Sequence, residues 1–119
     1  GDLISIKIML MVLPQLLEAS SDEGEEIDEE KIECFAKLIT VIGLILEQQS
    51  IGLRDIGKSD AYESLSQCWD RVEAFAGKNK DLKVPKISNR IKFMLQDLLE
   101  MRENGKFLIN YVFYIASIL

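Results

Sequence analysis

The spacing of the large apolar residues limits the fold of this chain more than any other feature. In four segments these residues recur every three or four positions, as on one face of an α-helix. No segment before Lys106 alternates apolar and polar residues with period two over the length of a strand. The sequence therefore predicts an all-α fold.

The first two predicted helices flank an acidic segment. The first helix covers about residues 2–19 and contains Pro14, which we expect to kink or divide it. Residues 20–30 carry seven carboxylates and no basic residue, a composition typical of a solvated loop. Asp28 is the predicted N-cap of the second helix, because Glu29 and Glu30 then lie in its first turn. This helix is expected to end near Gln49.

Two connections separate the remaining predicted helices. Residues 50–58 contain two glycines and lead to a third helix, which runs to about Ala76 with Asp60 and Glu63 as a capping box. Residues 77–86 form a lysine-rich loop, and Ser88 is the predicted N-cap of a fourth helix that ends near Glu103. Short connections favour antiparallel neighbours, so both a four-helix bundle and stacked helical hairpins fit this pattern.

The composition removes the usual means of catalysis. The 119 residues suffice for one small domain or part of a larger one, and none is a histidine, the commonest general base and zinc ligand. Cys34 and Cys68 lie in apolar helical patterns outside any CxxC pair, and we predict reduced core residues. The glycines lack the spacing of a phosphate-binding loop. We therefore expect a protein that is not an enzyme and needs no metal or cofactor.

The amino end carries an apolar run but no signal peptide. Residues 3–13 are rich in apolar side chains, yet a membrane-spanning helix needs ~20 apolar residues. A charged region and a cleavage site are both missing from this segment. The expected location is the cytosol or the nucleus.

Two of the predicted helices resemble signature segments of a known family. Residues 88–102, SNRIKFMLQDLLEMR, closely resemble the last signature helix in the middle domain of eukaryotic translation initiation factor 4G. Residues 32–43, IECFAKLITVIG, resemble that family's cysteine-containing helix ending in an Ile-Gly pair. Residues 1–4, GDLI, resemble the start of its Gly-Glu-Leu-aromatic segment. The resemblance covers residues 1–104 and implies the carboxy-terminal half of a longer domain, with antiparallel helical hairpins stacked as a partial HEAT-repeat solenoid.

This resemblance implies a function as well as a fold. It implies a non-catalytic cytoplasmic scaffold in translation initiation that binds the DEAD-box RNA helicase initiation factor 4A and also contacts RNA and initiation factor 3. Related domains in mRNA decay, cap binding and splicing engage other partners, so an adaptor of those pathways stays open as an alternative. The exposed turns at this end of the domain are the expected helicase side, and the candidate residues there are Arg90, Lys92, Phe93, Gln96, Asp97 and Arg102.

Several of these candidates have a structural alternative. Phe93 lies off the main apolar face of its helix, so it either packs on a neighbouring helix, which is the favoured alternative, or is an exposed anchor. Asp97 either meets a partner or pairs with Arg90 or Lys92. Trp69 falls at helical spacing with apolar neighbours and is predicted to be a core residue.

A lysine-rich stretch is the candidate RNA contact. Its basic side chains would gain by releasing counterions from a phosphate backbone, although a solubilising loop is the favoured explanation. The four residues concerned are Lys78, Lys80, Lys83 and Lys86.

Residues 105–119 depart from the family's pattern. Gly105, Lys106 and Phe107 can be encoded by GGT-AAG-TTT, which contains the GTAAGT of a splice donor, so translated intron is one explanation. The alternative is a genuine fifth helix or strand that caps the solenoid. In a purely structural protein, this apolar tail would serve self-association or attachment to a membrane surface.

Overall fold

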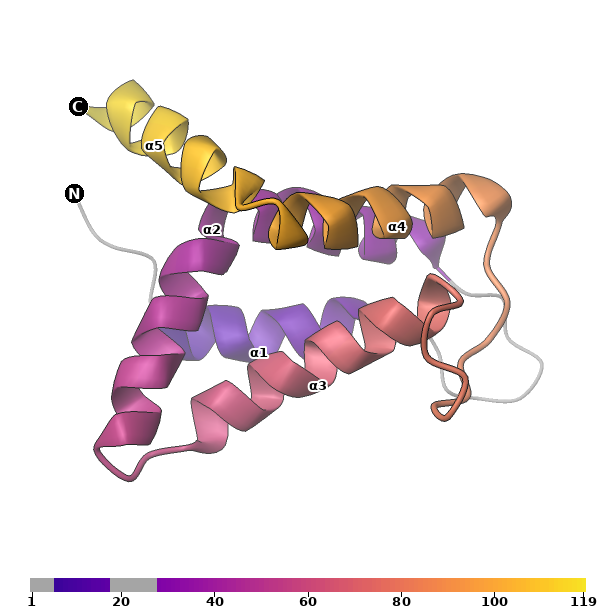
Figure 1. Ribbon diagram of the computed structural model, residues 1–119, viewed down its shortest axis with the longest axis horizontal. Coiled ribbons are helices and arrows are strands. Elements are labelled where there is room, and N and C mark those ends of the chain that lie inside the picture. The colour runs from indigo at the N-terminus through magenta and orange to yellow at the C-terminus, as the bar shows by residue number, and fades with distance from the viewer. Residues whose placement is uncertain (1–5, 18–27) are drawn as a thin grey trace.

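The computed structural model describes residues 6–17 and 28–119, which form five α-helices and, within these ranges, no strand. The helices are α1 (Ile6–Leu17), α2 (Glu29–Asp55), α3 (Asp60–Phe75), α4 (Asn89–Glu103) and α5 (Lys106–Ile118). In Figure 1, α1 and α3 run in one direction, whereas α4 and the first part of α2 run in the opposite direction. α1 and the first part of α2 are therefore antiparallel, as are α3 and α4, whereas α5 continues in the direction of α4. The prediction of an all-α fold built from helical hairpins is confirmed.

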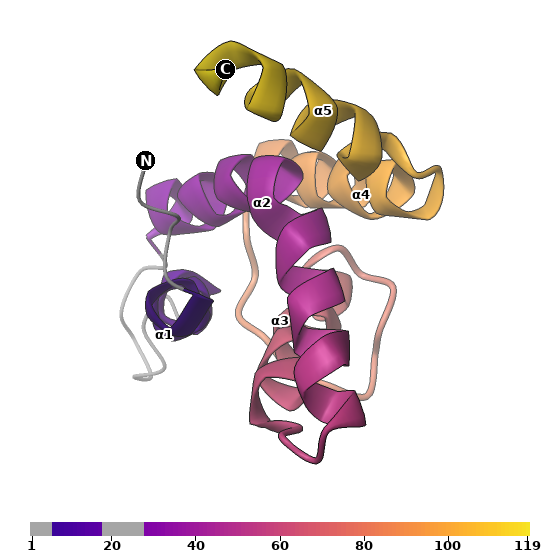
Figure 2. The same cartoon turned by 90° about the vertical axis from the view of Figure 1, so that its left-hand side faces the viewer.

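α2 is the central helix of the fold. It contacts each of the other four helices and bends part-way along its length, so that its second part descends beside α3 (Figure 2). Among the described helices, α2 alone is long and apolar enough by length and composition to cross a membrane, a property that core helices share. Eight of its residues are buried, in keeping with the prediction that this helix packs on more than one side: Ile32, Phe35, Ala36, Ile39, Ile42, Gly43, Leu46 and Ser50.

The helix boundaries confirm two predicted caps. The Asp28 carboxylate accepts a hydrogen bond from the backbone N–H of Glu30 at 3.1 Å, at the start of α2. The Ser88 hydroxyl accepts one from the N–H of Ile91 at 3.4 Å, at the start of α4. Both side chains satisfy backbone donors that have no partner within the helix.

Three predicted boundaries are wrong. α2 continues past Gln49 and through Gly52 to Asp55, since a glycine within a helix costs only about 1 kcal/mol and Ser50 is fully buried. α1 continues through Pro14. The residue that precedes α3 is Ser59, so Asp60 is already helical and forms no capping box. The predicted acidic loop falls mainly on residues 20–27, which lie outside the described residues.

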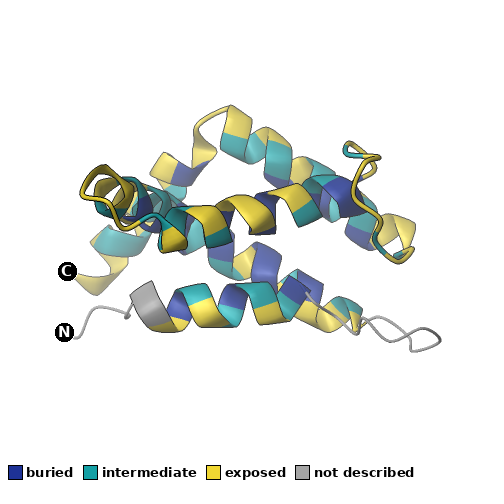
Figure 3. Ribbon diagram, turned by 90° about the horizontal axis from the view of Figure 1, so that it is seen from below, coloured by how far each residue is buried: buried dark blue, intermediate teal, exposed yellow. Residues whose placement is uncertain are grey.

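The core lies where the inner faces of all five helices meet. Buried residues recur along the helices between exposed ones, as expected of amphipathic helices around a shared core (Figure 3). Trp69 is 5% exposed, which confirms it as a core residue. Cys68 is buried as predicted, and burial raises the pKa of its thiol to about 11 although Arg71 opposes this change. The same prediction is wrong for Cys34, which is exposed because it faces outward between the buried residues of α2.

The tail joins this core through one residue. α5 is a helix and not a strand, and Phe107 is its buried residue. The Phe107 ring stacks on Trp69 with ring centroids 6.0 Å apart. It also lies against Gly43 of α2, where an added Cβ would be 3.4 Å from two atoms of the Phe107 ring. The backbone of α2 at Gly43 thus lies close to the Phe107 ring.

Candidate partner-binding groove

A shallow groove of about 520 Å³ separates α4 from the first part of α2. Its walls are mostly apolar, and charged side chains from both helices join them. The lining residues are Ala36, Lys37 and Thr40 of α2, and Arg90, Phe93, Met94, Asp97, Leu98 and Met101 of α4. An apolar surface with charged groups at its edge is typical of a site that recognises another protein.

The helical spacing of α4 explains which side chains reach this groove. Arg90, Met94 and Asp97 are separated by four and three residues, so they share one side of the helix. Ile91, Leu95 and Leu98 occupy the adjoining side and are buried. The same sequence that anchors α4 in the core thus presents a second row of residues along the groove.

Phe93 is exposed and is not a core residue. Its side chain is 56% exposed, so the favoured prediction that it packs on a neighbouring helix is wrong. Its helical angle places it beyond the buried row of α4, on the outer side of Arg90 and Asp97. An exposed aromatic side chain beside a groove is a common anchor for a partner.

Charges at the groove are partly neutralised within the protein. The Arg90 guanidinium lies 3.3 Å from the Glu33 carboxylate, and the Lys37 amine lies 3.9 Å from the same oxygen. Asp97 forms no ion pair with any residue of the described ranges, so the predicted pairing with Arg90 or Lys92 is wrong. Asp97 is exposed, and its carboxylate is therefore the free acceptor at this edge.

Hydrogen bonds join the first residue of α2 to the N-cap residue of α4. The Glu29 carboxylate accepts hydrogen bonds from the Ser88 backbone N–H at 2.6 Å and from the Ser88 hydroxyl at 2.8 Å. The backbone hydrogen bond, followed by the hydroxyl and the Arg90 charge, lowers the pKa of Glu29 below its ordinary value of 4.5, against a weaker effect of burial. The ionised form of Glu29 is thus the one that joins the two helices.

Three of the predicted site residues lie elsewhere on α4. The Gln96 side-chain amide donates to the Ala76 carbonyl at 2.9 Å, and therefore caps the end of α3. Lys92 lies beside Gly77, where an added Cβ would be 3.2 Å from the Lys92 Cε. Arg102 stacks over the Trp69 ring at 4.2 Å and lies 3.4 Å from the Glu47 carboxylate. The structure thus brings together Arg90, Phe93 and Asp97, but not Lys92, Gln96 and Arg102.

The four lysines of the candidate RNA contact are all exposed. Lys78, Lys80, Lys83 and Lys86 lie on the connection between α3 and α4. None of the four forms an ion pair within the part of the chain that the structure describes. Their charges are therefore available to solvent.

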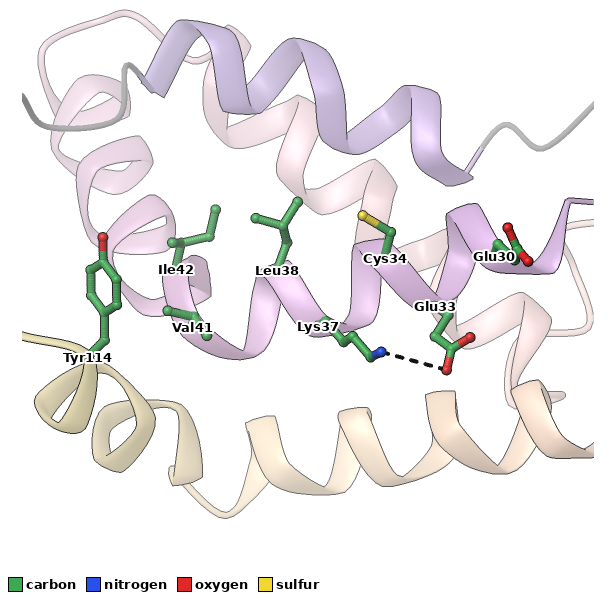
Figure 4. Close-up of a pocket in the computed structure, with 8 residues that line it drawn as sticks. All are labelled: Glu30, Glu33, Cys34, Lys37, Leu38, Val41, Ile42 and Tyr114. Carbon is green, nitrogen blue, oxygen red and sulfur yellow. Dashed lines mark ion pairs between the residues drawn. The ribbon is translucent and has the colours of Figure 1, made fainter. Parts of the chain in front are cut away.

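Sequence reasoning missed a second apolar hollow, of about 500 Å³, on α2 (Figure 4). Tyr114 of α5 lies at one end of it and Glu30 at the other. Cys34, Leu38 and Val41 lie between them. One feature of the sequence could have indicated this hollow: apolar residues cover too much of the circumference of α2 to form a single buried stripe. A metal site is not indicated, because no three His, Cys, Asp or Glu side chains of the described residues lie close enough together to hold an ion.

Comparison with known proteins links this chain to translation. It is 34% identical over 78 residues to eukaryotic translation initiation factor 4 gamma 1 of Mus musculus, which covers 66% of this chain and 4% of that protein. It is 33% identical over 75 residues to eukaryotic translation initiation factor 4 gamma 3 of Mus musculus and of Homo sapiens, covering 63% of this chain and 4% of each relative. About two thirds of the chain resembles a region of these factors.

The match is confined to a small part of each relative. This chain spans about 4% of their length. No known family profile matches the chain, and no solved structure matches it. The likeness supports a relationship to initiation factor 4 gamma.

Proposed function

We propose that this chain is part of a non-catalytic, cytoplasmic scaffold in translation initiation, and that its α2–α4 groove docks the DEAD-box RNA helicase initiation factor 4A. Residues 1–104 would form the carboxy-terminal half of a HEAT-type middle domain, and residues 105–119 an atypical tail. The observation that carries the proposal is the meeting of Arg90, Phe93 and Asp97 at one apolar groove. Similarity to relatives named as translation initiation factors supports the same assignment.

The chemistry of the groove fits a protein partner. Phe93 offers an apolar anchor, and the methionines Met94 and Met101 supply a deformable wall that adapts to a partner's side chains. The exposed Asp97 carboxylate selects for a basic group on the partner, and Arg90 for an acidic one. A scaffold that binds one state of a helicase more tightly than another shifts the helicase toward that state without catalysing a reaction itself.

RNA is the second partner of the proposal. The exposed lysines 78, 80, 83 and 86 gather positive charge on one connection of a chain whose net charge is −6. Such a local cluster is suited to phosphate contacts, which depend strongly on salt. Initiation factor 3 would bind the same scaffold, as the family resemblance implies. An adaptor of mRNA decay, cap binding or splicing with the same fold is the alternative.

The helicase proposal is tested by binding of purified initiation factor 4A to the full chain in isothermal titration calorimetry. We expect Phe93→Ala and Asp97→Ala each to weaken binding about tenfold or more, as for anchor residues at an interface. Phe113→Ala is the matched control, because Phe113 is also an exposed phenylalanine, at 70% against 56% for Phe93, and lies on α5. All three side chains are exposed, so helicity should be unchanged by circular dichroism.

Two results would count against the proposal. Equal loss of affinity in Phe93→Ala and Phe113→Ala would show that the groove has no special part in binding. An absence of binding by the well-folded wild-type chain would mean that the site lies outside these 119 residues or that the protein serves another pathway.

A further inference from the structure

The outward face of α5 is the largest uncovered apolar surface of the described residues. Every residue of α5 except Lys106, Asn110 and Ser117 is apolar or aromatic. A helix that is apolar on all sides is normally buried on all sides. Here the only buried side chain is Phe107, and Ile118 lies on the same side of the helix as Phe107. On the outward side, five large apolar side chains of α5 and its C-cap are more than half exposed: Leu108, Ile109, Val112, Phe113 and Leu119.

The size of this surface is close to what each partner contributes to a stable interface. At roughly 200 Å² for a large side chain, the five residues expose on the order of 700 Å². A standard protein interface takes about 800 Å² from each partner, whereas the largest apolar patch of a typical monomer is ~300–600 Å².

We propose that a second copy of this chain covers the face, with the two α5 helices packed antiparallel across a two-fold axis near Val112. Val112 is the middle residue of the helix, which runs from Lys106 to Ile118. In this register the large Ile109 of one copy lies against the small, exposed Ala116 of the other. A two-fold interface uses the same patch on both copies, so one apolar helix face is sufficient to form it.

The charges of α5 fit this arrangement. Lys106 is its only charged residue and lies at its first position. Antiparallel packing places Lys106 beside the last turn of the other copy's α5, where backbone carbonyls without helical partners carry partial negative charge. Helices that lie on membrane surfaces carry basic residues along a polar face, and α5 has no such row. The second copy is therefore favoured over a lipid surface.

The proposal is tested first by the mass of the full chain in analytical ultracentrifugation over a range of micromolar concentrations. We expect the average mass to rise from 13.5 kDa toward twice that value. Phe113→Glu should raise the dissociation constant at least tenfold, because it places two carboxylates near the two-fold axis. Phe93→Glu, an equally drastic change at the α2–α4 groove, should leave the dimer intact. A chain that stays monomeric, or a dimer unaffected by Phe113→Glu, overturns the proposal.

Cysteine cross-linking tests the register without weakening the interface by charge. In a Cys34→Ser background, which removes the exposed native thiol, Val112→Cys should form a disulfide-linked dimer under mild oxidation. Leu108→Cys is the control. In this register its thiol lies about 12 Å along the helix axis from the equivalent thiol of the other copy, which is too far for a disulfide. Cross-linking of both variants to the same extent would refute the register. Binding of a monomeric chain to phosphatidylcholine–phosphatidylserine vesicles through α5 would mean that a lipid surface, and not a second copy of the chain, covers this face.

This inference does not depend on the helicase proposal. Phe93 and Phe113 lie on different helices and serve different interfaces in the two proposals. Loss of helicase binding with an intact dimer, or the reverse, would distinguish failure of one from failure of the other.

Discussion

At the scale of single residues, two glycines of the same helix have different roles. A Cβ at Gly43 would lie 3.0 Å from the Ile39 side chain and 3.4 Å from the Phe107 ring, whereas one at Gly52 would have no atom within 4 Å. Both positions are helical. Gly43 therefore lies in a tight place, mainly against Ile39 of its own helix, and Gly52 is an ordinary glycine in the last turns of a helix.

These two positions provide a matched pair of substitutions. We expect Gly52→Ala to stabilise the protein by about 0.5–1 kcal/mol, because alanine favours the helix and meets nothing. Gly43→Ala should destabilise it by about 1 kcal/mol, since the cost of overpacking exceeds the same gain in helix propensity. The free energy of unfolding in urea measures both. Equal stabilisation by the two changes would mean that Ile39 and Phe107 accommodate a methyl group at Gly43 without strain.

At the scale of the helices, two arginines of α4 differ in what they hold together. Arg102 joins three helices, because it stacks on Trp69 of α3 and meets Glu47 of α2. Arg90 meets only the Glu33 carboxylate of α2, and its side chain is 62% exposed. A charge-reversal variant that combines both arginines would therefore disturb stability and the groove at once.

Separate substitutions distinguish these two roles. We predict that Arg102→Ala lowers the free energy of unfolding by about 1–2 kcal/mol through loss of the cation–π contact and packing. Arg90→Ala should change it by less than about 0.5 kcal/mol, as for a surface ion pair. Thermal or urea denaturation is the measurement. An Arg102→Ala variant as stable as wild type would mean that the contacts with Trp69 and Glu47 do not stabilise the fold and that Arg102 is available to a partner.

At the scale of the whole molecule, the tail decides whether the core is complete. Phe107 is the residue by which residues 105–119 enter the core, stacked on Trp69. The remaining residues of α5 contribute half-buried or exposed side chains. The explanation by translated intron concerns the transcript, and sequencing the spliced transcript would reject it if the same tail were encoded.

Deletion of residues 106–119 should expose Trp69 and the surface around Gly43. We expect a loss of about 3 kcal/mol or more, as for removal of a buried phenylalanine, and a decrease of more than ~10 °C in Tm. Deletion of residues 113–119, which retains Phe107, should cost less. Circular dichroism melting curves compare the two. Unchanged stability after the longer deletion would show that the tail is incidental to the fold.

Local patterns were sufficient for much of this protein. The apolar spacing predicted the all-α class, the positions of the four helices and the burial of Trp69, and short-range hydrogen bonding predicted the caps at Asp28 and Ser88. These features depend on residues within a few positions of one another, so they are present in the sequence itself.

Tertiary structure alone decided which face of each helix remained free. The extension of α2 past Gly52, the exposure of Phe93 and Cys34, and the separation of Arg102 from Arg90 depend on which helices pack beside them. Phe107 packs between Gly43 and Trp69, and these three residues belong to three helices that are distant in sequence. Burial of a side chain is a property of its neighbours in space, and helical periodicity specifies the angle of a residue but not what lies opposite it.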